Sequence, residues 1–152
     1  MAEAVLREQL ARAGLSGQVT VDSAGTGDWH LGEPIDSRAG AELRRHGYDA
    51  GGHRARQFDR SWFGRYDLIL AMDQSNLARL RWLAPDRDTA GRIALFLSFD
   101  PGRPGGGDLD VPDPYNGGPE EYALVFDLVQ AAGLGLADQL AALLAGRPGA
   151  EG

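Results

Sequence analysis

Apolar side chains recur at helical spacing along much of the chain. Residues 1–13 place Leu6 and Leu10 on one face, but no Ser, Thr, Asp or Asn precedes this helix to accept hydrogen bonds from its first amides. Further apolar repeats, each opened by an Asp or a Pro, predict helices at residues 36–46, 74–84 and 119–145 and a helical turn at 59–63. Gly133 and Gly135 are expected to weaken the middle of the last helix.

Three stretches have the pattern of buried strands. Residues 66–73 (YDLILAMD) form an apolar run between polar residues, residues 18–24 (QVTVDSA) place two valines on one face, and residues 93–97 are short and apolar. Strands that alternate with helices predict an α/β fold, in which a parallel sheet has helices on both faces. Three strands are few for such a core, so the predicted sheet is one strand short.

Length and composition indicate one globular domain. The chain has 152 residues, 43% of them hydrophobic, which predicts a single domain over residues 1–146 and a flexible tail at 147–152. A net charge of −7 argues against nonspecific nucleic-acid binding, which needs a basic surface. No signal peptide opens the chain and no apolar run approaches membrane-spanning length, so we expect a cytoplasmic protein without membrane contact.

The absence of cysteine excludes several kinds of chemistry within these 152 residues. It removes disulfides, thiolate metal sites and cysteine nucleophiles at once. Any covalent catalysis by a thiol therefore needs a residue that this sequence does not contain.

A long loop at residues 99–118 holds the most unusual carboxylate. Asp113 is placed between two prolines, which restrict the backbone and position the side chain as a general acid requires. A Pro-Asp-Pro turn without chemistry explains the same residues. Asp108, Asp110 and Asp113 offer oxygens to a hard cation, but the segment lacks the glycine and closing glutamate of a calcium loop.

Other candidates are weaker when taken one at a time. Trp29 and His30 lie in a glycine-rich loop and either form a ligand wall or pack over the end of a strand. His53 stands between basic residues that suit either a phosphate or a solvated surface. Ser23 lacks the Gly-x-Ser-x-Gly setting of an activated nucleophile.

Five segments together resemble the low-molecular-weight protein tyrosine phosphatases. In chain order they are MAEAVLRE, DSAGTGDWHLGEPIDSRA, HRARQF, YDLILAMDQSNL and DVPDPYNGG. The resemblance implies a three-layer α/β fold with a parallel sheet flanked by helices. It also implies hydrolysis of phosphotyrosine, in a protein or a small aryl phosphate, through a phosphocysteine intermediate, with no metal or cofactor.

The resemblance also assigns roles to individual residues. Asp113 matches the general acid/base that protonates the leaving phenol and then activates water. Tyr115 matches an aromatic residue that frames the substrate ring, and Trp29 matches the aromatic residue of the facing wall. Ser23 and His53 match positions in the hydrogen-bond network that supports the phosphate loop.

The chain departs from the family at its start. The family opens with a buried strand and a Cys-x-x-x-x-x-Arg-Ser loop, followed by a proline and the segment that matches MAEAV. The resemblance therefore implies that the first, central strand, the nucleophile and the catalytic arginine are missing. We expect the chain as written to be N-terminally truncated, inactive and able to associate with itself through exposed sheet edges. Asn116 is a smaller departure, where many relatives carry a second tyrosine.

Three accounts of function remain open. In the first, Met1 is an internal methionine of an active phosphatase, and the DNA upstream encodes an apolar strand and the cysteine loop. In the second, a stop codon precedes Met1 and the chain is a noncatalytic protein that binds phosphoproteins. The third account is an arsenate reductase relative, which the absence of further cysteines disfavours.

Overall fold

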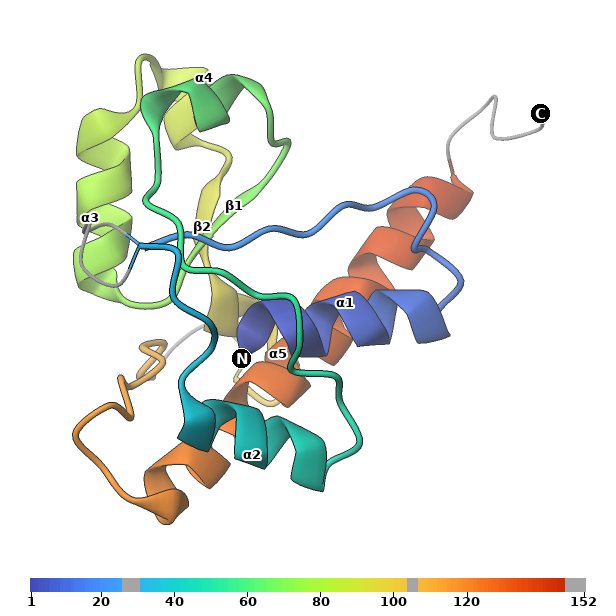
Figure 1. The fold of residues 1–152 in the computed structure, drawn as a ribbon. Coiled ribbons are helices and arrows are strands. Elements are labelled where there is room, and N and C mark those ends of the chain that lie inside the picture. The colour runs from blue at the N-terminus through green and yellow to red at the C-terminus, as the bar shows by residue number, and fades with distance from the viewer. Residues whose placement is uncertain (26–30, 104–106, 147–152) are drawn as a thin grey trace.

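The computed structural model describes residues 1–25, 31–103 and 107–146 (Figure 1). Five α-helices, two strands and two 3-10 helices make up this part of the chain. In order they are α1 (Ala2–Arg12), α2 (Ser37–Arg45), η1 (Arg60–Gly64), β1 (Ile69–Ala71), α3 (Gln74–Leu83), α4 (Arg87–Ala90), β2 (Ile93–Leu95), η2 (Phe96–Phe99) and α5 (Pro119–Ala145).

The helix starts follow the capping residues of the sequence. An aspartate side chain accepts hydrogen bonds from backbone amides at the starts of α2, η1, α3 and α4; these residues are Asp36, Asp59, Asp73 and Asp86. Helix α1 has no such side-chain bond, as its sequence predicts. The sequence did not predict the short α4, because a single turn is too short to show a period. It also did not predict η2, whose first two residues, Phe96 and Leu97, it assigned to the strand at residues 93–97.

The sheet of the described residues has two parallel strands, where the sequence predicted three. Ile69 pairs with Ile93 and Ala71 with Leu95. The prediction of a strand at residues 18–24 is wrong, because this stretch forms no ladder with any described segment, and the bridge between Gly25 and Gln57 lies just beyond it. A strand needs a partner ladder, and here the Val21 carbonyl instead accepts a hydrogen bond from an arginine side chain.

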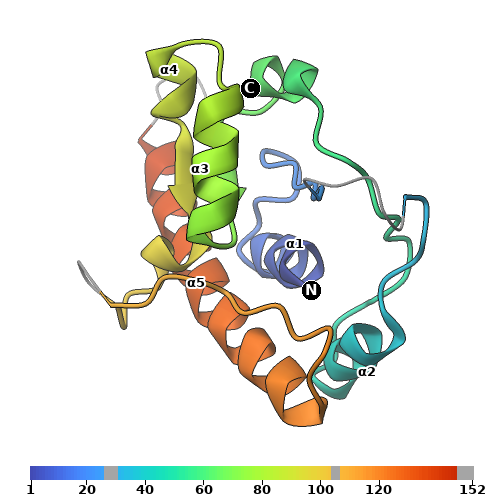
Figure 2. The same ribbon diagram turned by 90° about the vertical axis from the view of Figure 1, so that its left-hand side faces the viewer.

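Helices nevertheless cover both faces of this sheet, which confirms the α/β class. Ile69 and Ala71 point into an apolar cluster with α3, and Leu70 and Met72 pack on a second cluster formed mainly by α1, α2 and α5. Figures 1 and 2 show the strands between α3 and the pair α1 and α5. The alternation of side chains along β1 thus separates two cores.

The glycines of α5 serve packing, which the sequence reading did not anticipate. A Cβ atom at Gly133 would lie 2.0 Å from Oε1 of Gln9 on α1. One at Gly135 would lie 1.9 Å from the carbonyl oxygen of Phe99, in η2. Because both distances are far below van der Waals contact, the two glycines allow α5 to approach α1 and η2 closely.

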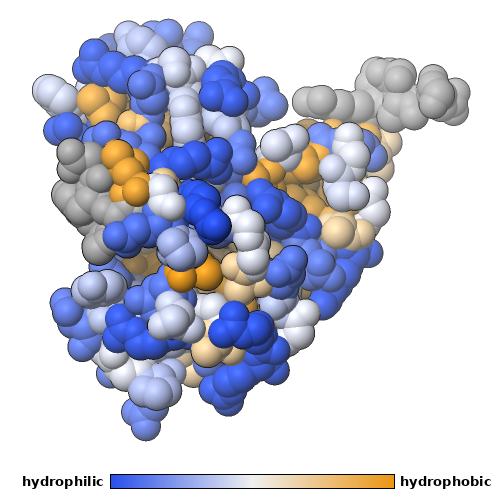
Figure 3. Space-filling view, viewed as in Figure 1, coloured by the Kyte–Doolittle hydropathy of each residue, from blue (hydrophilic) through white to orange (hydrophobic). Residues whose placement is uncertain are grey.

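Helix α5 is by length and composition able to cross a membrane, contrary to the expectation that no apolar run approaches that length. In this structure Phe126, Val129 and Leu136 of α5 instead form the centre of the larger core. Apolar surface also gathers over the C-terminal part of α5 (Figure 3). The exposed leucines of the helix are Leu124, Leu134 and Leu143.

Candidate active site

The loop that carries Asp113 is built from consecutive hydrogen-bonded turns. The Asp113 carboxylate accepts a hydrogen bond from the Tyr115 amide at 3.0 Å, and the Pro114 carbonyl accepts one from the Gly117 amide at 2.8 Å. The Gly118 amide then donates to the Glu121 carboxylate at 2.7 Å, which joins the loop to the first turn of α5. The first of these bonds is an Asx turn, which fixes the direction of the Asp113 carboxylate.

The start of the same loop is fixed to the carboxyl end of β1. The Val111 amide donates to the Met72 carbonyl at 2.8 Å, and the Asp110 carboxylate accepts from the Gln74 amide at 2.9 Å. Ligands of parallel α/β sheets bind beyond the carboxyl ends of the strands, so this loop lies where such a site is expected. Asp113 itself is exposed.

A second group of polar side chains meets at Glu3, in the first turn of α1. The Ser23 hydroxyl donates to Glu3 at 2.6 Å, His53 Nδ1 lies 2.9 Å from the same carboxylate, and Arg7 donates to it at 2.7 Å. The structure therefore brings together Ser23 and His53, which the family resemblance assigns to one network, and adds Glu3 as the group that joins them. The side chain of Glu3 is only 10% exposed.

The pKa of Glu3 reflects this arrangement. Burial raises the pKa, but the hydrogen bonds from Ser23 and His53 and the charge of Arg7 outweigh burial and hold the pKa of Glu3 below its ordinary value. The ionised carboxylate is therefore the form that the fold stabilises. Sequence reasoning missed Glu3 because its partners lie 20 and 50 residues away; only the Arg7 contact, at i+4, follows a readable spacing.

A neighbouring pair extends the polar network toward η1. Tyr66 donates its phenol hydrogen to Asp22, and Arg56 lies 3.3 Å from the same carboxylate and 4.0 Å from Glu3. The hydrogen bond from Tyr66 holds the pKa of Asp22 below its ordinary value, against the effect of burial, with Arg56 adding to it. Arg56 thus joins the carboxylates of Asp22 and Glu3.

The predicted site residues therefore fall into two groups. Asp113 and Tyr115 lie in the loop before α5, and Ser23 and His53 lie on Glu3 at the N-terminal end of α1. In Figures 1 and 2 this end of α1 lies between the segment at 19–25 and the loop leading into α5. Trp29, predicted as the facing aromatic wall, lies outside the described residues, as does His30.

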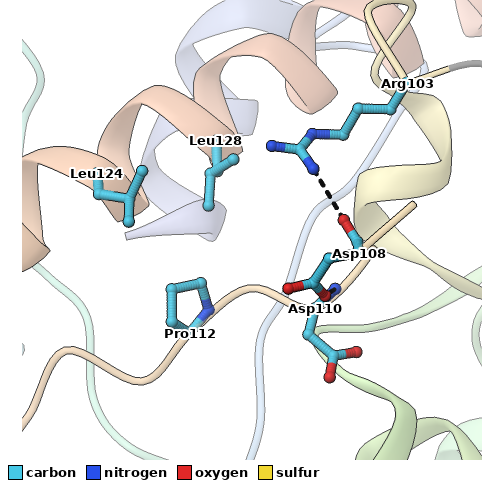
Figure 4. Close-up of a pocket in the computed structure, with 6 residues that line it drawn as sticks. All are labelled: Arg103, Asp108, Asp110, Pro112, Leu124 and Leu128. Carbon is cyan, nitrogen blue, oxygen red and sulfur yellow. Dashed lines mark hydrogen bonds between the residues drawn. The ribbon is translucent and has the colours of Figure 1, made fainter.

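A cleft of about 230 Å³ lies between α5 and the loop that carries Asp113 (Figure 4). Its lining residues are Arg103, Asp108, Asp110, Pro112, Leu124 and Leu128. The Arg103 guanidinium is engaged with the Asp108 carbonyl at 2.8 Å and lies 3.4 Å from Asp100. Two carboxylates line the cleft, so a phosphate dianion would be repelled there.

The loop aspartates do not converge as ligands of a cation. One Asp108 oxygen accepts a hydrogen bond from the Asp110 amide, and one Asp110 oxygen accepts from the Gln74 amide. Within residues 1–25, 31–103 and 107–146, no three His, Cys, Asp or Glu side chains form a group able to hold a metal ion. The aspartates act on the backbone of the loop and of α3.

The Glu3 network predicts how stability depends on pH. Because the pKa of Glu3 is lowered in the folded chain, its contribution is present above its ordinary pKa of 4.5 and is lost as the pH falls through the lowered value. We expect Glu3→Gln to lower the free energy of unfolding by about 2 kcal/mol at pH 7, since hydrogen bonds to a charged group are lost. Urea unfolding between pH 7 and pH 2 measures both effects.

The matched control is Glu8→Gln on the same helix, whose ion pair with Arg12 is exposed. This variant should change the free energy of unfolding by well under about 1 kcal/mol. Equal losses in the two variants, or a pH dependence of Glu3→Gln as steep as that of the parent chain, would contradict a special role for Glu3.

Comparison with known proteins places the chain among phosphatases. A family model described as low molecular weight phosphotyrosine protein phosphatase matches residues 1–144. A low molecular weight protein-tyrosine-phosphatase of Streptomyces coelicolor is 50% identical over 136 residues, which cover 90% of this chain and 82% of that protein.

Solved structures give the same result. A protein tyrosine phosphatase of Entamoeba histolytica, crystallised with Hepes in its active site, superposes with a TM-score of 0.83 at 30% identity, covering 91% of this chain and 86% of that one. YfkJ of Bacillus subtilis superposes with a TM-score of 0.80 at 34% identity, covering 97% and 87%.

Proposed function

The chain belongs to the low molecular weight phosphotyrosine protein phosphatase family, and on this premise we propose that it serves the hydrolysis of phosphotyrosine. The substrate is a phosphotyrosine-containing protein or a small aryl phosphate. The observation that carries the proposal is the build of the Asp113 loop, which is fixed to β1 at one end and to α5 at the other. Such a loop can hold a carboxyl group at one place relative to a bound phenol.

The proposed reaction has two steps. A cysteine thiolate attacks phosphorus, the bond from phosphorus to the phenol oxygen breaks, and Asp113 gives its proton to that oxygen. Asp113, now a carboxylate, takes a proton from a water molecule that attacks the phosphocysteine and releases phosphate and thiolate. Tyr115, 53% exposed beside Asp113, is proposed to frame the substrate ring, and Trp29 is proposed as the facing wall.

Ser23 and His53 are proposed to support, by hydrogen bonds, the phosphate-binding loop that the family resemblance implies. Their shared contact with Glu3, at the N-terminal end of α1, supports this role. Free amides at a helix N-terminus favour an anion, and a thiolate close to them is stabilised. No metal or cofactor takes part in the proposed reaction.

The nucleophile is the part of the reaction that these 152 residues do not supply. The sequence contains no cysteine. We therefore propose that the thiolate, and the guanidinium that binds the phosphate with it, come from outside this sequence. A noncatalytic role in binding phosphoproteins is the second candidate, and the same lack of cysteine is the observation that favours it.

The purified 152-residue polypeptide is expected to hydrolyse p-nitrophenyl phosphate no faster than buffer does, because it contains no thiol to form the proposed phosphocysteine. Release of p-nitrophenol, measured by absorbance over hours at high protein concentration, checks this. Asp113→Asn is the control for a contaminating enzyme. Turnover that this substitution abolishes would show that the chain is catalytic without a thiol, and would overturn the proposed mechanism.

The cytoplasm is the proposed compartment of the protein, because protein phosphotyrosine is made with ATP inside the cell.

Self-association is a further proposal. The edge of β1 that faces away from β2 is proposed to pair with a second copy of the chain, since β1 pairs through its ladder only with β2 among the described residues.

A further inference from the structure

Arg38, in the first turn of α2, reaches across to the loop that carries Asp113. Its Nη1 donates to the Gly117 carbonyl at 3.4 Å, and its guanidinium carbon lies 5.4 Å from the centre of the Tyr115 ring and 5.0 Å from that of Tyr122. We propose that Arg38 is a positioning residue, which holds the Asp113 loop in the geometry that proton donation requires. This inference rests on the proposed function of Asp113.

The exposed middle of the loop, residues 113–117, is the part that Arg38 contacts. Val111 is tied to β1 and Gly118 to α5, and two hydrogen-bonded turns lie between them, one from the Tyr115 amide to Asp113 and one from the Gly117 amide to Pro114. Asp113 and Tyr115 are both exposed. The contacts of Arg38 fall within this stretch, on Tyr115 and Gly117.

Arg38 is itself held in place by Asp36. The Asp36 carboxylate accepts hydrogen bonds from the Arg38 amide at 2.8 Å, from its Nε at 3.3 Å and from its Nη2 at 3.1 Å. The same carboxylate begins α2 as its N-cap. A planar guanidinium fixed on one edge by Asp36 presents its other edge and its face to the loop, which the ammonium of a lysine cannot do.

The guanidinium of Arg38 also lies over the ring of Tyr122. Tyr122 is only 3% exposed and belongs to α5, so it does not move with the loop. Burial raises the pKa of Tyr122, and the charge of Asp36 adds to this effect, while the charge of Arg38 opposes it. Arg38 therefore contacts one immobile ring and one ring of the loop, and joins them by cation–π contacts.

The contact between Arg38 and Tyr115 also fixes the orientation of the Asp113 carboxylate, through the Asx turn. That carboxylate is oriented by the Tyr115 amide, and Tyr115 is the residue whose ring Arg38 covers. A general acid has to lie within hydrogen-bond reach of the leaving oxygen, so a loop that opens often supplies the acid less often. Arg38 is proposed to increase the fraction of time for which the loop is closed, and it contacts neither the transferred proton nor the phosphate.

Amide hydrogen exchange of the 152-residue chain, followed by NMR, tests the proposal. The Tyr115 amide reports the bond to the Asp113 carboxylate, and the Gly117 amide reports the turn from Pro114. In Arg38→Gln we expect both to exchange about threefold to tenfold faster, because local opening of the loop becomes more frequent. The Gly118 amide, bonded to Glu121, is the internal reference and should change less.

Arg79→Gln is the matched control, since Arg79 makes the same kind of contact over the Trp82 ring at 5.2 Å, on α3. Arg38→Lys keeps the charge but loses the planar guanidinium. Its exchange rates at Tyr115 and Gly117 should lie between those of Arg38→Gln and those of the parent chain. The proposal is overturned if Tyr115 and Gly117 exchange no faster than in Arg79→Gln, or if every amide of the chain accelerates equally in both Arg38 variants. Because these readouts concern loop order alone, their failure leaves the proposed role of Asp113 to its own kinetic test.

Discussion

Replacement of Gly135 by alanine is expected to lower the free energy of unfolding by about 2–4 kcal/mol, a large share of the stability of a domain this size. The new Cβ would lie 1.9 Å from the Phe99 carbonyl oxygen and 3.0 Å from both the Phe99 carbonyl carbon and Pro101 Cδ. The carbonyl belongs to the backbone, so α5 or η2 has to shift. Alanine favours an isolated helix over glycine by about 1 kcal/mol, which is too little to offset the clash.

Gly146→Ala provides the control at the end of the same helix. A Cβ there meets no atom closer than 3.7 Å, and the residue already has a negative φ. Urea unfolding of the two variants should give a lower midpoint for Gly135→Ala only. A stability of Gly135→Ala equal to that of the parent chain would mean that α5 and η2 do not approach as closely as the structure has them.

The helices could be predicted from the sequence because their signals are local. An aspartate before each apolar repeat accepts the first amides of α2 and α3, and Pro119 opens α5, so the starts were predicted to within one residue. The contact of Gly135 with Phe99 was not predictable in this way. The two residues are 36 positions apart in the sequence. A glycine inside a helical pattern indicates only a less stable helix until the segment that packs against it is known.

The strand at residues 18–24 was predicted wrongly for a related reason. Its alternating valines fit a strand, but a strand forms only where a second strand supplies the ladder, and β1 pairs through its ladder with β2 alone in the part of the chain that the structure describes. The candidate site shows the same limit. Asp113 stands out locally between two prolines, whereas Glu3 meets Ser23 and His53, and Arg38 meets Tyr115, only when distant segments come together.

Asp113→Asn is expected to lower kcat about 10²- to 10⁴-fold in a chain that is supplied with the thiol. The enzyme for this test is a fusion that places an apolar strand and a Cys-x-x-x-x-x-Arg-Ser-Pro loop ahead of Met1. Asparagine can still accept the Tyr115 amide, so the turn is kept while the proton is lost. Steady-state hydrolysis of an aryl phosphate gives kcat, and burst kinetics separate formation of the phosphoenzyme from its breakdown.

Asp108→Asn in the same fusion is the control for the loss of a carboxylate from this loop. Its oxygen accepts the Asp110 amide and lies in the cleft beside Arg103, away from the proposed chemistry. This variant should keep kcat within about threefold of the parent fusion, since asparagine can accept the same hydrogen bond. A similar loss in both variants would assign the effect to the loop as a whole.

The most direct test of Asp113 as the proton donor compares two leaving groups. Phenol needs a proton as it leaves far more than p-nitrophenol does, because p-nitrophenolate is the more stable anion. In the fusion, Asp113→Asn should therefore slow phosphoenzyme formation from phenyl phosphate at least about tenfold more than from p-nitrophenyl phosphate. An equal slowing of both substrates would show that Asp113 does not protonate the leaving group, and would contradict the account.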